Sequence, residues 1–210
     1  MANKLPGGLY ALIDDQLRPA LSVVEKARLA IQGGVHVLQL RLKTHADRPA
    51  LEVIRQVLEL AKRTGTVVIV NDRVDWALVT RAHGVHLGAD DLPPSEARRL
   101  LGPHAFIGVT TRNIGDIRAA ADQGADHVGL GPLFATTTKQ VAAPSLGLER
   151  LSEIARLSPL PIVGIAGITL ERIGAVARAG AHAAAVGSDL LLADDLVSRA
   201  KALQRAFWGS

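Results

Sequence analysis

The chain has 210 residues, of which 48% are hydrophobic and 21% charged, which is enough for one buried core and too apolar for disorder. It has no cysteine, which excludes disulfides and cysteine-ligated zinc and is typical of a cytoplasmic protein. The net charge of +4 indicates an anionic partner, but aromatic residues are only 3% and the basic residues are scattered. We therefore expect small phosphorylated ligands, no nucleic acid and no membrane, since no apolar run reaches the length of a signal peptide or a membrane span.

Short apolar runs alternate along the chain with longer stretches of helical periodicity. The apolar runs predict strands near Leu9–Ile13, Val37–Leu42, Val67–Val70, Val85–Leu87, Phe106–Val109, His127–Leu130, Ile162–Ile165 and Ala183–Val186. The periodic stretches predict helices near Ser22–Gln32, Pro49–Arg63, Val74–Arg81, Pro94–Leu101, Ile114–Gln123, Leu148–Leu157, Leu170–Ala179 and Leu196–Phe207. No linker or charge block interrupts this pattern, so we treat residues 1–210 as one domain.

Residues at the predicted helix ends agree with these boundaries. Asn113 and Thr169 are suitable N-caps. Glycine follows four helices, where a left-handed C-terminal residue favours it: Gly33, Gly65, Gly124 and Gly180.

Uninterrupted β-branched strands joined by crossover helices predict a parallel sheet that is covered on its outer face. Eight such units in this length predict a single (β/α)8 TIM barrel with parallel strands and outer helices, at the short end of its size range. The alternative is an open doubly wound sheet, which usually needs fewer strands.

In such a barrel, functional residues lie at the carboxyl ends of the strands. Cations, carboxylates, hydroxyls and glycines all occur at the predicted ends. They are Gln39, Arg41 and Lys43 after strand 2, Asn71 and Asp72 after strand 3, Gly88 and Asp91 after strand 4, Thr110 after strand 5, the loop 131–139 after strand 6, Gly164 to Gly167 after strand 7, and Gly187 and Ser188 after strand 8. Together they suit a metal-bound polyphosphate and a second phosphate.

Asp72 and Asp91 have two interpretations. Each could cap the following helix, or the pair could share an Mg²⁺ ion, which takes one or two carboxylates together with substrate phosphates. Arg41 and Lys43 alternate along a strand and can both face the barrel mouth, where an uncompensated charge is costly unless a ligand neutralises it.

The glycines after strands 7 and 8 permit a phosphate to approach backbone N–H groups, or they form tight turns. The threonine-rich loop is long enough for a functional lid, although alone it is a polar loop. The histidines show no metal-binding spacing. We expect His86 to be a hydrogen-bonded structural residue and Trp76 to pack on an outer helix.

Five stretches resemble the thiamine phosphate synthase family, over nearly the whole chain. They are Gln39-Leu40-Arg41-Leu42-Lys43, Val70-Asn71-Asp72, Val85-His86-Leu87-Gly88 with Asp91, Val128-Gly129-Leu130-Gly131-Pro132 through Thr138-Lys139, and Pro161-Ile162-Val163-Gly164-Ile165 with Gly167. The resemblance implies a transferase that joins hydroxymethylpyrimidine diphosphate to a thiazole phosphate, with release of pyrophosphate.

The resemblance also implies roles for individual residues. Asp72 and Asp91 would bind Mg²⁺. The pyrimidine diphosphate would be held by Gln39, Leu40, Arg41, Leu42, Lys43, Asn71, Thr110 and Lys139, of which Arg41, Lys43, Thr110 and Lys139 would act in catalysis. The thiazole phosphate would be held by Thr136, Thr137, Thr138, Gly167, Gly187 and Ser188. Because a thiazole nitrogen attacks with its own lone pair, the reaction requires no general base, in keeping with the lack of a catalytic His or Cys constellation.

The chain departs from the family pattern at four positions. Ala89 replaces a common Gln, Thr110 replaces Ser, and Ala166 replaces the first residue of a Gly-Gly pair. Arg112 replaces a His on which related thiazole tautomerases rely, and those relatives tend to lose the aspartate at position 72. The opposite combination here favours a synthase over a tautomerase. A non-catalytic barrel that senses thiamine precursors is a third hypothesis, which the retained aspartates and Lys139 oppose.

Overall fold

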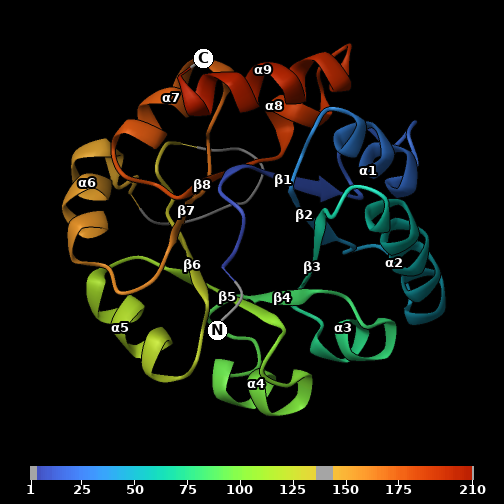
Figure 1. Cartoon of the computed structure of the whole chain (residues 1–210), viewed down its shortest axis with the longest axis horizontal. Helices are drawn as coiled ribbons and strands as arrows, with labels where there is room; N and C mark the ends of the chain where they lie inside the picture. The colour runs from blue at the N-terminus through green and yellow to red at the C-terminus, as the bar shows by residue number, and fades with distance from the viewer. Residues whose placement is uncertain (1–3, 136–143, 210) are drawn as a thin grey trace.

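The computed structural model describes residues 4–135 and 144–209. Eight parallel strands form a closed barrel in the order of the chain, and helices surround it (Figure 1). The strands are β1 (Gly8–Asp14), β2 (Val37–Arg41), β3 (Val67–Asn71), β4 (Gly84–Leu87), β5 (Phe106–Thr111), β6 (His127–Leu130), β7 (Ile162–Gly164) and β8 (Ala183–Val186). The helices are α1 (Val23–Gln32), α2 (Asp47–Lys62), α3 (Val74–Thr80), α4 (Pro94–Leu101), α5 (Ile114–Asp122), α6 (Gly147–Leu157), α7 (Leu170–Arg178), α8 (Ser188–Leu191) and α9 (Leu196–Trp208).

The closure of the barrel excludes the open doubly wound sheet. β8 pairs in parallel with β1, from Gly8 opposite Ala183 to Ala11 opposite Val186. The TIM-barrel prediction is therefore confirmed, with its eight strands and the helices that follow them. One element was not predicted, the four-residue helix α8 directly after β8.

The helix ends confirm most of the predicted caps. The Asn113 side chain accepts a hydrogen bond from the Asp116 N–H at 3.0 Å, as an N-cap should. Thr169 lies at the N-cap position of α7, but its side chain caps no backbone N–H. The prediction for Gly33 is wrong, because Gly33 has φ −75° and the left-handed residue is Gly34. The other three predicted glycines have positive φ: Gly65, Gly124 and Gly180.

The alternation of side chains along the strands divides the core into two layers. Inside the barrel, the bulky Tyr10 lies opposite Ala185 of the neighbouring strand, and the small β8 side chains leave room for it. Outside the barrel, the other strand faces pack against the helices, as Leu38 and Leu40 of β2 do. This division determines which side chains can reach a ligand in the barrel mouth.

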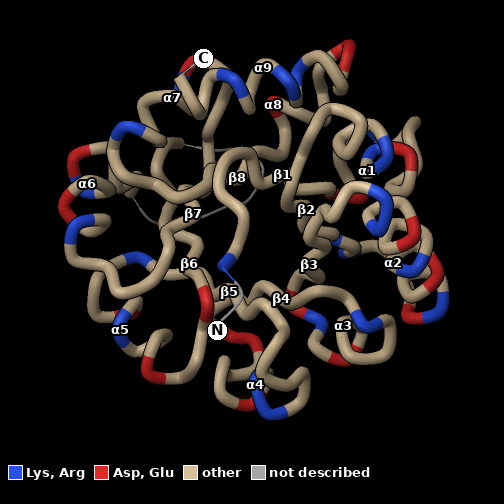
Figure 2. The backbone as a smooth tube through the Cα atoms, in the orientation of Figure 1, with Lys and Arg blue, Asp and Glu red and all other residues tan. Residues whose placement is uncertain are grey.

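The helices cover the barrel with amphipathic faces. In α2, the buried residues recur with helical spacing: Ala50, Ile54, Val57, Leu58 and Ala61. Charged residues lie mainly on the outer helices and loops (Figure 2). Trp76 packs on its helix as predicted, 5% exposed, and its indole N–H donates to Asp47 at 3.0 Å. Within the described parts of the chain, no helix has both the length and the apolar character to cross a bilayer.

Arg98 of α4 joins two turns at the amino-terminal end of the barrel. Its Nη1 donates to the carbonyl oxygens of Gly102 and Ala105, at 2.9 and 2.7 Å. Its Nη2 donates to the Gly124 carbonyl at 3.0 Å and to the Asp126 carboxylate at 2.6 Å. One guanidinium thus ties the turn before β5 to the turn before β6, at the end that stabilises such barrels.

Candidate active site

The inward side chains of β2 form a column that rises to the mouth of the barrel. In the strand register, Gln39 lies opposite Leu12 and Ile69, and Arg41 lies opposite Asp14. Gln39 is 4% exposed, and its amide donates to the Tyr10 hydroxyl at 3.0 Å. Gln39 therefore lies at the floor of the mouth, and Arg41 lies one pleat nearer to solvent.

Leu40 and Leu42 alternate with this column and point the other way. Both are buried in the layer between the strands and the helices, at 1% and 6% exposure. If these two residues contact a substrate, the contact has to come from their main chain.

Arg41 forms an ion pair with the last residue of the neighbouring strand. Its Nη1 donates to Asp14 Oδ2 at 2.8 Å. The Asp14 side chain is 5% exposed and that of Arg41 is 24% exposed. The carboxylate is nearly buried, while the guanidinium reaches solvent at the mouth.

Lys43 and Asp72 meet across the ends of β2 and β3, where the Lys43 ammonium contacts Asp72 Oδ2. Asp72 has φ +63°, and its N–H donates to the His86 carbonyl at 2.8 Å. A left-handed residue other than glycine is strained, and such strain concentrates at functional sites. The turn that strains Asp72 is the turn that directs its carboxylate toward Lys43.

Asp91 faces Asp72 from the loop after β4, and its Oδ2 accepts the Gly88 N–H at 2.6 Å. Burial opposes ionisation of Asp72, but hydrogen bonds from Lys43 and Asp91 lower its pKa below the ordinary value. Burial, followed by the neighbouring Asp72 carboxylate, raises the pKa of Asp91 against the effect of the Gly88 N–H. Two carboxylates that disfavour joint ionisation form a site for a proton or a cation.

This donor set fits a hard divalent cation. In the described part of the chain, no three His, Cys, Asp or Glu side chains converge on a potential metal site. Mg²⁺ nevertheless suits two carboxylates, because it keeps several waters and takes its other ligands from substrate phosphates. The capping interpretation of the two aspartates is wrong, since the N-cap residues of α3 and α4 are Arg73 and Pro93.

Asn71 and Thr110 lie at the same side of the mouth as the two aspartates. Asn71 ends β3 opposite His86 in the strand register. The His86 Nε2 and the Thr110 Oγ1 lie 3.0 Å apart. His86 is therefore hydrogen-bonded, as predicted, and its partner is a residue expected to contact the diphosphate.

Beyond β7, the chain makes a left-handed turn at Ala166 and Gly167, with φ +71° and +67°. A Cβ at Gly167 would lie 2.6 Å from the Ala135 carbonyl oxygen, so this glycine permits close approach of the loop after β6. The Phe134 N–H donates to the Ala166 carbonyl at 3.3 Å in the same contact. The loop is thus held beside the predicted thiazole phosphate site up to Ala135.

Gly187 and Ser188 follow β8 and begin α8, with Gly187 as the N-cap. The first N–H groups of a helix have no intrahelical acceptor and suit an anion. The other predicted residues of the thiazole phosphate site, Thr136 to Thr138, and the predicted diphosphate ligand Lys139 lie outside the described residues.

Sequence reasoning missed Asp14. Tyr10, Leu12 and Asp14 share the inward face of β1 by simple alternation, and Asp14 is at its carboxyl end. This alternation of inward residues, which ends at Asp14 beside the mouth, was the sequence signal that could have identified it.

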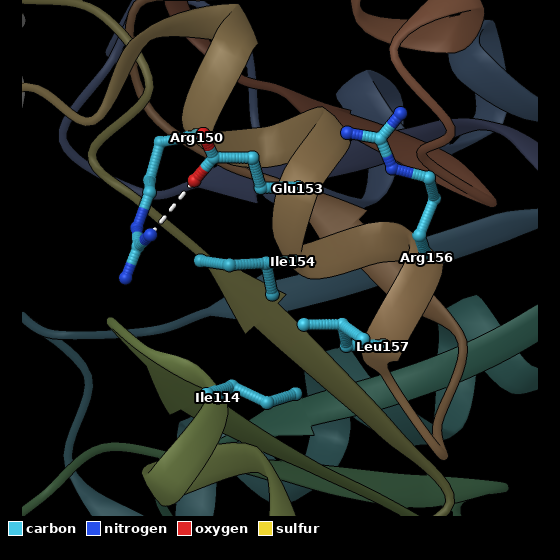
Figure 3. A pocket seen from close by; sticks show the side chains of 6 residues that line it. All are labelled: Ile114, Arg150, Glu153, Ile154, Arg156 and Leu157. Atoms are coloured by element: carbon cyan, nitrogen blue, oxygen red, sulfur yellow. Dashed lines mark hydrogen bonds and ion pairs between the residues drawn. The ribbon is translucent and has the colours of Figure 1, made fainter.

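A separate groove of about 410 Å³ lies between α5 and α6 on the outside of the barrel. The side chains of Ile114, Ile154 and Leu157 line it, and Arg150 forms an ion pair with Glu153 at 2.8 Å beside them (Figure 3). Ile114 begins α5 and the other lining residues lie on α6; none of them has an assigned role at the mouth, so we assign the groove no part in the reaction.

A closed parallel barrel whose charged residues converge at the carboxyl ends of its strands defines a (β/α)8-barrel enzyme. The model of the thiamine monophosphate synthase family matches residues 9–190. The chain belongs to this family, and it is accordingly a transferase.

Individual relatives agree with the family model. A thiamine-phosphate synthase of Myxococcus xanthus is 52% identical over 97% of this chain and 93% of its own length. One of Anaeromyxobacter dehalogenans is 48% identical over 96% of this chain and 88% of its own length. Among solved structures, a thiamine phosphate pyrophosphorylase from Pyrococcus furiosus superposes with a TM-score of 0.88 at 31% identity, covering 99% of this chain and 97% of the other.

Proposed function

We propose that this enzyme joins hydroxymethylpyrimidine diphosphate to a thiazole phosphate, forming thiamine phosphate and releasing pyrophosphate. The observation that carries the proposal is the convergence of Arg41, Lys43, Asp72 and Asp91 on one side of the mouth. Membership of the thiamine monophosphate synthase family supports the same reaction. Two cations beside two carboxylates suit a diphosphate that is bound with a divalent metal.

The chemical step needs charge stabilisation more than proton transfer. The thiazole nitrogen attacks with its lone pair, and the electron-rich aminopyrimidine stabilises a methylene cation as the C–O bond to the diphosphate breaks. Negative charge then grows on the leaving group, where preorganised cations lower the barrier. We assign this role to Arg41 and Lys43, together with Lys139, and we assign a hydrogen bond from its hydroxyl to Thr110.

Gln39 and Asn71 would orient the pyrimidine diphosphate, with main-chain contacts from Leu40 and Leu42. Asp72 and Asp91 would hold Mg²⁺, which when bound would neutralise charge on the diphosphate. The opposed pKa directions of the two carboxyl groups support a shared cation. The thiazole phosphate would lie on the other side of the mouth, at Gly167, Gly187, Ser188 and Thr136 to Thr138.

Because both substrates are phosphorylated and do not cross membranes, we place the reaction in the cytoplasm. No observation favours the tautomerase or the sensor hypothesis. Arg112, which replaces the tautomerase histidine, is exposed in the turn after β5. An NMR time course should accordingly show no acceleration of thiazole carboxylate tautomerisation by the purified protein.

The test is incubation of the protein with both substrates and Mg²⁺, with separate assays for thiamine phosphate and pyrophosphate. We expect the two products in equal amounts. Omission of either substrate is the control. Failure to form thiamine phosphate, with both substrates shown to be intact, would contradict the proposal.

A further inference from the structure

The contact between Asp14 and Arg41 has no role in the reaction as described above. The two residues lie opposite each other in the register of β1 and β2. Arg41 Nη1 donates to Asp14 Oδ2 at 2.8 Å, and the Asp14 side chain is only 5% exposed. A nearly buried carboxylate therefore holds one nitrogen of a guanidinium that opens on the mouth.

Asp14 is held in place by groups other than Arg41. Its Oδ1 accepts the Gln16 N–H at 2.8 Å, so both carboxylate oxygens are engaged. Its main-chain oxygen accepts a hydrogen bond from Lys26 Nζ at 3.0 Å, and Lys26 is fully buried. The carboxylate cannot turn away from Arg41 without breaking the contact with Gln16.

A guanidinium carries five N–H donors in a rigid plane, and Asp14 accepts a hydrogen bond from one of its nitrogens, Nη1. The remaining donors are available to a phosphate oxygen. Arginine side chains lose rotamer freedom when they bind an anion, and a side chain already held in place loses less.

We propose that Asp14 is a positioning residue, which holds Arg41 in the orientation in which the remaining guanidinium donors meet the diphosphate substrate. This inference rests on the proposed function, which assigns Arg41 to that substrate. Asp14 itself touches no reacting atom.

A positioning role and a purely electrostatic effect of Asp14 predict opposite changes in substrate binding when its carboxylate is removed. By charge alone, a carboxylate near the site repels a diphosphate, so its removal should strengthen substrate binding. If Asp14 positions Arg41, its removal should weaken substrate binding. Asp14→Asn separates the two cases, because Gln16 and Arg41 donate to different oxygens of the carboxylate and asparagine has an NH2 donor in place of one of them.

The experiment is a double-mutant cycle with Asp14→Asn, Arg41→Ala and the double variant. KM for the pyrimidine diphosphate is measured at saturating thiazole phosphate and Mg²⁺. We expect Asp14→Asn to raise this KM about tenfold and to change it less than about twofold when Arg41 is already alanine. KM for the thiazole phosphate should stay within about twofold of the wild type.

Asp126→Asn is the matched control. It breaks a comparable ion pair, with Arg98 at 2.6 Å, at the opposite end of the barrel. This variant should lower the melting temperature and leave both KM values unchanged. A purely structural role of Asp14 would give the same pattern for Asp14→Asn.

The outcomes separate the two proposals. If Arg41→Ala raises KM but Asp14→Asn lowers it or leaves it unchanged, or if the two effects multiply, the positioning role is overturned. If Arg41→Ala leaves KM unchanged, the assignment of Arg41 is wrong and the inference fails with it. Should circular dichroism show that Asp14→Asn is unfolded, Asp14→Glu replaces it, and an unchanged KM in that variant overturns the proposal.

Discussion

Lys43 of the loop after β2 and Asp72 of the loop after β3 form an ion pair at the barrel mouth. Both partners are predicted to meet the substrate or its metal, whereas the partner of Arg41 is Asp14, outside the predicted metal site. Metal binding at Asp72 should therefore weaken its contact with Lys43 and leave the ammonium for the diphosphate. Lys43 would thus be released by metal binding, whereas Arg41 would keep its partner Asp14.

The first prediction concerns the metal. Asp72→Asn and Asp91→Asn should each reduce kcat about 100-fold or more, because the negative charge that holds the cation is lost. Both residues lie in loops outside the hydrophobic clusters, so circular dichroism should be unchanged. Steady-state rates over an Mg²⁺ titration provide the measurement. Full turnover of the wild type in excess EDTA would contradict the metal requirement.

A second prediction concerns Ser188 at the start of α8. Ser188→Ala removes one hydrogen bond to a charged phosphate, a contribution of about 1.5–3 kcal/mol that is present before and during the reaction. Such uniform binding raises KM with little change in kcat. We expect KM for the thiazole phosphate to rise about tenfold or more, with KM for the diphosphate nearly unchanged.

Lys139→Ala is the contrasting variant. Charge on the departing diphosphate grows in the transition state, so the loss of this ammonium should lower kcat more than it raises KM. Varying each substrate in turn distinguishes the two variants. Weaker binding mainly of the diphosphate by Ser188→Ala would reverse our placement of the two substrates.

The third prediction concerns backbone strain at Ala166. A left-handed conformation costs an alanine about 1–2 kcal/mol, and glycine loses about 0.5–1 kcal/mol more entropy on folding. Ala166→Gly should therefore stabilise the protein by up to about 1.5 kcal/mol in urea unfolding. Ala175→Gly, in the middle of α7, should instead destabilise it by about 1 kcal/mol. Destabilisation by both variants would show that Ala166 is not strained.

The fourth prediction concerns pH and His127, a fully buried residue inside the barrel near Tyr10 and His86. Burial, and then repulsion from His86 and His182, lowers the pKa of His127 to about 3. Between about pH 6.5 and pH 3, His127 is protonated in the unfolded chain but not in the folded protein. This residue should therefore make the protein less stable as pH falls, by about 2 kcal/mol at pH 5.

His127→Leu should reduce that loss of stability. Urea unfolding at pH 7.5 and pH 5 measures the effect, and His104→Asn, at an exposed position, is the control. An equal loss of stability in the wild type and in His127→Leu would show that another group carries the pH dependence.

The barrel was predictable because its strands and helices have clear periodicities. Eight apolar runs, each followed by an amphipathic helix, allow few other arrangements. α8 was not found because four residues do not establish a helical period. Gly33 was misassigned because two glycines follow α1, and local sequence does not decide which of them adopts positive φ.

The site was less predictable than the fold. The polar residues at the strand ends were identifiable, because topology alone brings those ends together. The ion pairing was not, because the contact of Arg41 with Asp14 depends on the register between β1 and β2. The sequence around Asp72 also permits helix capping, which the structure excludes because Arg73 is the N-cap residue of α3.

Arg98 has a consequence for how this barrel can change. Its Nη1 and Nη2 together donate to four acceptors at the end of the barrel away from the mouth, so they join the turns before β5 and β6 without contacting the mouth. Substitutions at the mouth can therefore be screened for altered substrate preference in a scaffold that is stabilised in part by contacts at the opposite end. Directed evolution of this chain should tolerate randomisation of the loops after the strands and should fail when Arg98 is replaced.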